Sequence, residues 1–252
     1  MDYDFQRASF LKRAPAWLLD MIILITLATG LMAAISYVVD IDTTIEHVSE
    51  RRAYYVEEYG VSFDVTEEQI QQMSDEELAK YQAAAEELAK DTEIQKALEL
   101  LMNQILIIAG FGFLGAFVIL EVLIPMWLKN GQTLGKKCFG IGLMRKDGIT
   151  VTPFMLFVRA ALGKFTVETM IPIFLVLMSF FGIMSMGLIL ALVFLLVQII
   201  VPVATRNKTA IHDLAACTVA VDLASQMIFD SVEEMQAYNA EIYGDKAFEG
   251  RE

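Results

Sequence analysis

Residues 165–204 read FTVETMIPIFLVLMSFFGIMSMGLILALVFLLVQIIVPVA, and almost every side chain in this block is apolar. A helix needs about 20 apolar residues to cross the hydrocarbon core of a bilayer. The block of 40 residues is therefore too long for one membrane-spanning helix and long enough for two. We expect a tight hairpin over residues 180–187, where FFGIMSMG holds the only break in the block.

Two earlier apolar runs, residues 14–39 and 100–128, are also long enough to span a bilayer. Pro15 suits the first turn of the first span, where its missing N–H costs nothing. The composition agrees, because 56% of the residues are hydrophobic and the mean hydropathy is +0.52. The sequence thus predicts an all-α membrane protein with about four transmembrane helices, and it excludes a soluble enzyme and a disordered chain.

Charge sets the expected orientation. Lysines and arginines lie before the first span, between the second and third, and after the fourth, which places all these segments on the cytoplasmic side by the positive-inside rule. Residues 40–99 carry 17 acidic and 5 basic residues and are expected outside. Both termini are then cytoplasmic. The formal net charge of −13 argues against a nucleic-acid binder.

These patterns divide the chain into six segments. They are an N-terminal segment with transmembrane helix 1 (1–39), an acidic helical extracytoplasmic insertion (40–99), transmembrane helix 2 (100–128), a basic cytoplasmic loop with a hairpin (129–164), transmembrane helices 3 and 4 (165–205), and a cytoplasmic C-terminal segment (206–252).

The outer insertion is rich in helix-forming residues, and Ser74 followed by Glu77 is a capping-box pattern that predicts the start of a helix. Its acidic surface suits a docking face for another protein or a vestibule that gathers cations. A solvated helical cap that packs on itself is the simpler interpretation.

Asp20, Glu121 and Glu168 lie within apolar runs, in the half of the membrane nearer the cytoplasm. Ionisable residues in such positions cost about 2.5–3.5 kcal/mol and normally face a partner or a water-filled cavity. Asp20 needs a cation or a donor from another helix, and Arg159 and Lys164 are nearest by expected depth. Arg13 is expected to extend into the lipid headgroups.

Three polar residues each stand four positions before a proline in the later spans. Proline removes the hydrogen bond to the carbonyl four residues earlier, so each freed carbonyl belongs to a residue that also has a side-chain oxygen. Such groups favour an ion or proton pathway, although plain helix kinks explain them equally simply. The pairs are Glu121 with Pro125, Glu168 with Pro172, and Gln198 with Pro202.

In the cytoplasmic loop, GQTLGKK at 131–137 is one residue short of a phosphate-binding loop, and nucleotide binding is rejected. Residues 139–144 and 149–152 flank an Asp-Gly turn and predict a hairpin, to which TVAV at 218–221 could add a strand. The basic residues of this loop could instead bind anionic headgroups. Cys138 and Cys217 form neither a disulfide framework nor a metal-site spacing, so no cofactor and no metal are expected.

Three stretches together resemble the RDD family of small bacterial membrane proteins. They are KRAPAWLLD at 12–20, GQTLGKKCFGIGLMRKDGITVTPFMLFVRA at 131–160, and IHDLAACTVAV at 211–221. The arginine and two aspartates of the family name match Arg13, Asp20 and Asp213. The resemblance implies a multi-pass protein of the bacterial inner membrane and a role in transport, with cation/proton antiport as one activity.

The leading hypothesis is a secondary transporter that exchanges protons for a monovalent cation, functioning as a homo-oligomer. Asp20 would titrate, Glu121 and Glu168 would be auxiliary ligands, and Arg13 and Arg159 would set their pKa values. Asp213 is either a helix-capping or sheet-locking group near Arg145 or Arg206, or a group that exchanges protons with the cytosol. His212 beside it could sense cytosolic acidity, but an ordinary surface histidine is the simpler interpretation. The alternative is a non-transporting scaffold or accessory subunit that binds a partner membrane protein through the outer cap. The sequence contains no set of residues typical of a catalytic site, so an enzyme is not predicted.

Overall fold

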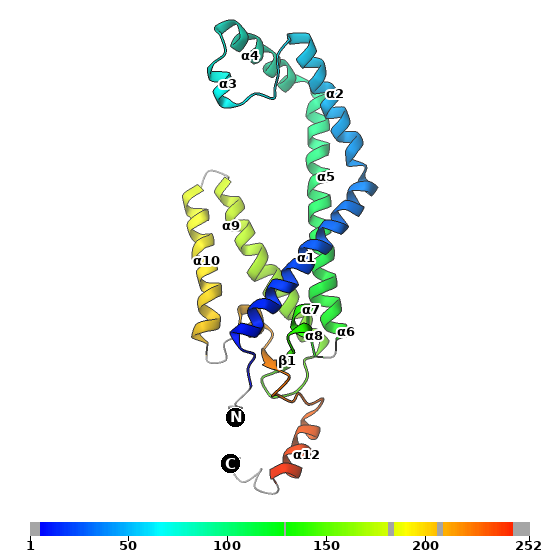
Figure 1. Ribbon diagram of the computed structural model, residues 1–252, viewed down its shortest axis with the longest axis vertical. Coiled ribbons are helices and arrows are strands. Elements are labelled where there is room, and N and C mark those ends of the chain that lie inside the picture. Colours follow the sequence, from blue (N-terminus) through cyan, green and yellow to red (C-terminus); the bar gives the residue numbers. More distant parts are fainter. Residues whose placement is uncertain (1–5, 129, 181–183, 206–208, 244–252) are drawn as a thin grey trace. The chain divides into compact units, whose positions relative to one another are not determined.

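The computed structural model describes residues 6–128, 130–180, 184–205 and 209–243. The chain forms two compact units. The first, unit 1, combines Met1–Ile25 with Phe117–Glu252, and the second, unit 2, is Thr26–Ala116. Helices α1 (Phe10–Val39) and α5 (Thr92–Phe117), labelled in Figure 1, each contribute residues to both units.

Among the described residues, three helical stretches are long and apolar enough to cross a membrane. They are α1, the continuous run Thr92–Trp127, which contains α5, η1 (Val118–Leu123) and α6 (Ile124–Trp127), and the Met186–Ala204 part of α10 (Met184–Ala204). Few of their apolar side chains are buried inside the protein, which suits contact with lipid. The chain is therefore a multi-pass membrane protein. Helix α1 begins at Phe10, earlier than expected, so Pro15 lies inside the helix rather than in its first turn.

A further long helix runs without interruption through α8 (Pro153–Val158), η2 (Arg159–Met170) and α9 (Ile171–Phe180). It starts earlier than the apolar block at 165 indicated, because Arg159 and Ala160 turn inward while Phe154 and Phe157 on the other face are exposed. Helices α9 and α10 lie side by side (Figure 1). The expected hairpin over 180–187 includes residues 181–183, which lie outside the described residues.

Unit 2 carries the helices of the acidic segment 40–99, which are α2 (Ile41–Tyr59), α3 (Glu67–Gln71) and α4 (Asp75–Lys90). The Ser74 capping box is confirmed: the Ser74 hydroxyl accepts from the Glu77 N–H at 3.3 Å, and the Glu77 carboxylate accepts from the Ser74 N–H at 2.9 Å. Asp91 connects the residues just before α5 to α2, because its carboxylate accepts hydrogen bonds from the Arg51 guanidinium and, at 3.1 Å, from the Tyr55 hydroxyl.

Unit 1 contains a two-stranded sheet. Strand β1 (Ile141–Arg145) pairs antiparallel with β2 (Thr218–Asp222), and Gly142 lies opposite Val221. The expected pairing of 218–221 with the loop is therefore confirmed. The second arm of the expected hairpin, residues 149–152, forms only isolated bridges, one of them between Met144 and Thr150.

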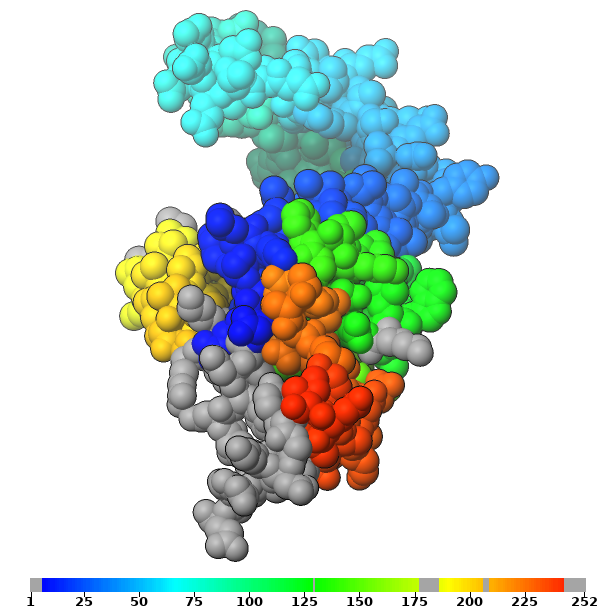
Figure 2. All heavy atoms as spheres, turned by 60° about the horizontal axis from the view of Figure 1, so that its bottom comes forward, coloured from blue at the N-terminus to red at the C-terminus, as the bar shows by residue number. Residues whose placement is uncertain are grey.

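Segments from both ends of the chain pack against this sheet. The N-terminal residues follow the free edge of β2, where the Ala8 N–H donates to the Ala220 carbonyl at 3.2 Å. Helix α12 (Val232–Tyr243) buries Met235, and just before it the Phe229 carbonyl accepts from the Thr150 N–H at 2.9 Å. Figure 2 shows the N-terminal segment in blue, the β2 region in orange and α12 in red on one face. Two short helices, α7 (Leu134–Cys138) and α11 (Ile211–Ala215), complete unit 1.

Candidate functional site

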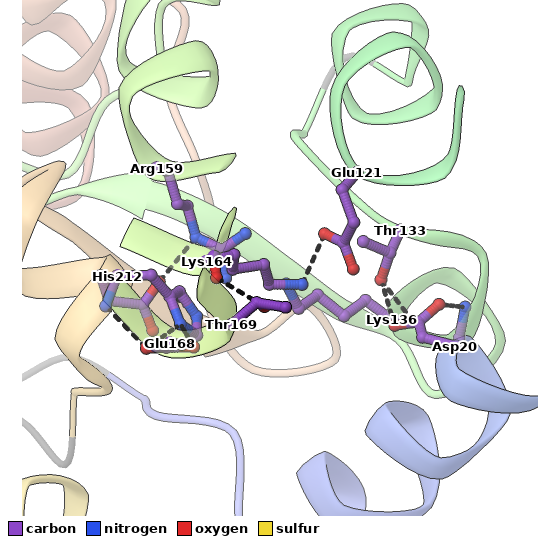
Figure 3. A network of polar contacts seen from close by, with 11 residues as sticks. Asp20, Glu121, Thr133, Lys136, Arg159, Lys164, Glu168, Thr169 and His212 are labelled. Atoms are coloured by element: carbon purple, nitrogen blue, oxygen red, sulfur yellow. Dashed lines mark hydrogen bonds and ion pairs between the residues drawn. The ribbon is translucent and has the colours of Figure 1, made fainter. Parts of the chain in front are cut away.

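Unit 1 gathers ionisable side chains from α1, η1, α7, η2 and α11 into what we call the charged layer (Figure 3). A buried charge is costly unless another charge or hydrogen bonds compensate for it. The partners of each side chain therefore indicate what the layer can do. Its members are Asp20, Glu121, Lys136, Arg159, Lys164, Glu168, His212 and Asp213.

Asp20 binds the start of α7 and not a cation. One carboxylate oxygen accepts from the Thr133 hydroxyl at 2.5 Å, and the other accepts from the Gly135 N–H at 2.7 Å. The expected donor from another helix is thus present, but neither Arg159 nor Lys164, the two cations nearest by expected depth, supplies it, because both pair with other carboxylates. Depth along a helix does not determine which way a side chain faces.

Gly135 makes this arrangement possible. A Cβ atom at this position would overlap the carbonyl oxygen of Ala16 and lie 2.9 Å from the Asp20 carboxylate. A side chain there would therefore push α7 away from α1. The glycine of the 131–137 motif serves close helix contact and not phosphate binding.

Two ion pairs connect η2 to its neighbours. The Nζ of Lys164 lies 2.5 Å from Oε2 of Glu121, which belongs to η1. Arg159 donates to Asp213 of α11 at 2.8 Å, with side chains only 3% and 5% exposed, and the Thr218 hydroxyl donates to the same oxygen at 3.2 Å. Burial alone would raise the pKa of Asp213, but the charge of Arg159 and other nearby cations outweighs it and holds that pKa well below its usual range.

The structure assigns Asp213 a different partner from those expected. Arg145 pairs with Asp147 at 2.6 Å instead, and Arg206 lies outside the described residues. Arg13 also differs from expectation, because its guanidinium donates to the Ala220 carbonyl at 2.9 Å rather than extending into headgroups. Arg13 therefore ties the start of α1 to β2.

His212 is largely enclosed, with its side chain 13% exposed, and it packs against η2 rather than lying on the surface. Its Nδ1 lies 2.7 and 2.8 Å from the two oxygens of Glu168, and its backbone N–H donates to Glu168 at 3.0 Å. Burial and the charge of Arg159 lower the pKa of His212, which favours the neutral ring, and a proton on Nδ1 of that ring would be donated to Glu168. A Cβ at Gly163 would lie 2.5 Å from His212 Cα, so this glycine allows η2 and α11 to touch.

One of the three proline pairs has a clear structural partner. Pro172 lacks the N–H that a regular helix would direct to the Glu168 carbonyl. The side-chain amide of Gln198, from α10, donates to that carbonyl at 3.2 Å. The Glu168–Pro172 pair thus joins two helices. Both η1 and η2 are π-helical and end shortly before a proline, and such segments are frequent at functional sites.

Lys136 is a candidate functional residue that sequence reasoning missed. Its Nζ is buried and has no hydrogen-bond partner among the described residues. Burial and the charges of Arg159 and Lys164 lower the pKa of Lys136 to about 7, while Glu121 and Asp213 oppose this shift. Lys136 can therefore gain or lose a proton near neutral pH. The sequence held one signal for Lys136: it directly follows Gly135 in the 131–137 motif, which does not bind phosphate.

Among the residues that the structure describes, no group of three or more His, Cys, Asp or Glu side chains is placed to hold a metal ion. The sequence model described as RDD family matches residues 7–217, a range that contains the whole charged layer. The chain belongs to the RDD family. No curated protein and no solved structure matches it. In this RDD protein the three residues that we matched to the family name bond to different elements, Arg13 to β2, Asp20 to α7 and Asp213 to η2.

Proposed function

We propose that this RDD protein is a secondary transporter that exchanges protons for a monovalent cation at the charged layer. The observation that carries the proposal is the buried Nζ of Lys136, which has no hydrogen-bond partner within the described part of the chain. The proton is placed on Lys136 and not on Asp20, because both oxygens of Asp20 already accept hydrogen bonds.

The charge balance supports a cation as the second substrate. Together with Arg13, the layer is formally neutral when Lys136 is protonated and His212 is neutral, with four carboxylates and four cationic groups. When Lys136 loses its proton, one negative charge is left uncompensated in a buried setting, which is unfavourable. A monovalent cation that binds near Glu121 would restore neutrality.

Competition between these two states is the basis of exchange. The carboxylate of Glu121 and the backbone carbonyl that Pro125 leaves without its regular helical donor are oxygen ligands of the kind that hard cations prefer. Protonation of Lys136 would repel the bound cation, and cation binding would favour release of the proton. The two ions would therefore alternate at the same layer.

The proposed topology has four spans, with residues 153–180 as the third. The exposed side chains of Phe154, Phe157 and Leu162 on this helix suit lipid. Both termini would be cytoplasmic in a bacterial inner membrane, because the basic segments fall on that side. Four spans are few for a transporter, so a homo-oligomer is part of the proposal.

The test is proton flux in proteoliposomes that contain a pH-sensitive dye, after pulses of Na⁺, K⁺ or Li⁺. Lys136→Met removes the titrating amine at similar length. Lys137→Met is the matched control, because Lys137 is the exposed neighbour on the same helix. We expect cation-dependent flux in the wild type and in Lys137→Met, and none in folded Lys136→Met.

Two results would overturn the proposal. Flux that persists in Lys136→Met would show that Lys136 does not carry the exchanged proton. Absence of flux from correctly folded wild-type protein with all three cations would reject the exchange activity.

A further inference from the structure

Helix α7 has only five residues, so it cannot hold its own position. Isolated helices shorter than about 12 residues are marginal in water, and a single turn depends on contacts from outside. The start of α7 receives these contacts from α1, through the carboxylate of Asp20.

Hydrogen bonds lead from Asp20 to the backbone of Lys136. The Asp20 carboxylate accepts from the Thr133 hydroxyl at 2.5 Å, and the oxygen of that hydroxyl accepts from the Lys136 N–H at 3.4 Å. The second oxygen of Asp20 accepts from the Gly135 N–H, the residue directly before Lys136. The carboxylate also compensates the positive end of this helical turn.

We propose that Asp20 and Thr133 form a clasp that holds Lys136 in the charged layer, so that Asp20 is a positioning residue and not a proton carrier. The clasp fixes the backbone on both sides of the peptide bond before Lys136. The side chain then extends from α7 toward Glu121, Arg159, Lys164 and Asp213, whose charges act on its amine.

Loss of the clasp has a specific consequence. Without it α7 separates from α1, and the long side chain of Lys136 can carry its amine to water. In water the pKa of this amine returns toward the ordinary lysine value of 10.5. The effect of the clasp on transport rests on the proposed function, but its effect on Lys136 does not.

The experiment measures Lys136 directly, with the full chain in lipid nanodiscs. The amine is acylated with acetic anhydride over a range of pH, and the extent of reaction at Lys136 is measured by mass spectrometry of its peptide. Only the neutral amine reacts, so the midpoint of the profile reports its titration. The variants are Asp20→Asn and Thr133→Val, with Thr133→Ser as the conservative replacement that keeps the hydroxyl.

Thr152→Val is the matched control. Thr152 also caps a helix through its hydroxyl, at the start of α8, where it accepts from the Met155 N–H at 3.3 Å. We expect a wild-type midpoint near 7, unchanged in Thr133→Ser and Thr152→Val. In Asp20→Asn and Thr133→Val the midpoint should rise by roughly one pH unit or more.

An unchanged midpoint in folded Asp20→Asn and Thr133→Val would overturn the clasp. If both variants fail to fold, the milder Thr133→Ala decides in the same way, and a wild-type midpoint near 10.5 would also reject the proposal. A shifted midpoint without any wild-type flux would support the clasp and reject exchange. Wild-type flux together with unshifted midpoints in Asp20→Asn and Thr133→Val would support exchange and reject the clasp.

Discussion

The buried pair of Arg159 and Asp213 offers the sharpest test of how this fold is held together. Arg159→Met keeps the length of the side chain but removes its charge. Within the described residues, the Asp213 carboxylate, 5% exposed, then keeps the Thr218 hydroxyl at 3.2 Å as its one hydrogen-bond donor, and His212 Nε2 lies 3.6 Å from it. Removing one partner of a buried pair costs about 3–5 kcal/mol, because the other charge is left uncompensated.

The double variant separates this penalty from the worth of the pair. Arg159→Met with Asp213→Leu leaves no buried charge, and such replacements are often neutral or stabilising by about 1–4 kcal/mol. We therefore expect each single variant to lower the free energy of unfolding by about 3–5 kcal/mol and the double variant to lose far less than their sum.

The assay is unfolding by titration with SDS in mixed micelles, followed by circular dichroism. Arg52→Met is the control, because its pair with Asp64 has side chains 41% and 85% exposed, and we expect a change below about 1 kcal/mol. Because the pKa of Asp213 is lowered, its contribution should be fully present above its ordinary pKa of 3.8 and should disappear only as pH falls further. Additive single and double effects would refute the reasoning.

Three further expectations concern the same unit and can be measured by the same unfolding titration. Between pH 7 and 10.5 the unfolded chain keeps a proton on Lys136 that the folded protein has released, so wild-type stability should rise with pH by roughly 3–5 kcal/mol. A profile of the same slope in Lys136→Met would contradict this. Gly163→Ala should lower stability by about 1–3 kcal/mol through overlap with α11, whereas Gly110→Ala, where a Cβ meets nothing within 4 Å, should not. Gln198→Leu should cost about 0.5–1.5 kcal/mol by removing the donor of the half-buried hydrogen bond to the Glu168 carbonyl, and unchanged stability would mean that this bond is dispensable.

Local patterns in the sequence predicted local structure well. The apolar runs located the membrane helices, because a bilayer requires continuous apolar length. The Ser74–Glu77 box predicted a helix start, and the TVAV stretch predicted the strand that pairs with β1. Each of these features depends on residues close in the chain or on composition alone.

The partners of the buried charges could not be predicted in this way. Expected depth placed Arg159 and Lys164 near Asp20, but depth does not give the direction of a side chain, and in the folded chain they face Asp213 and Glu121 instead. The start of the helix at residue 153 was hidden for a related reason. Its charged residues suggested a loop, although they face inward and pair across helices.

The hydrogen bond from Gln198 to the Glu168 carbonyl links two positions on different helices that need each other. In a related chain without Pro172, the backbone N–H of residue 172 would donate to that carbonyl within the same helix. An amide side chain at position 198 would then no longer be needed as a donor. Pro172 and Gln198 should therefore occur together in related sequences. Their joint presence or joint loss among family members would show which relatives hold these two helices together in the same way.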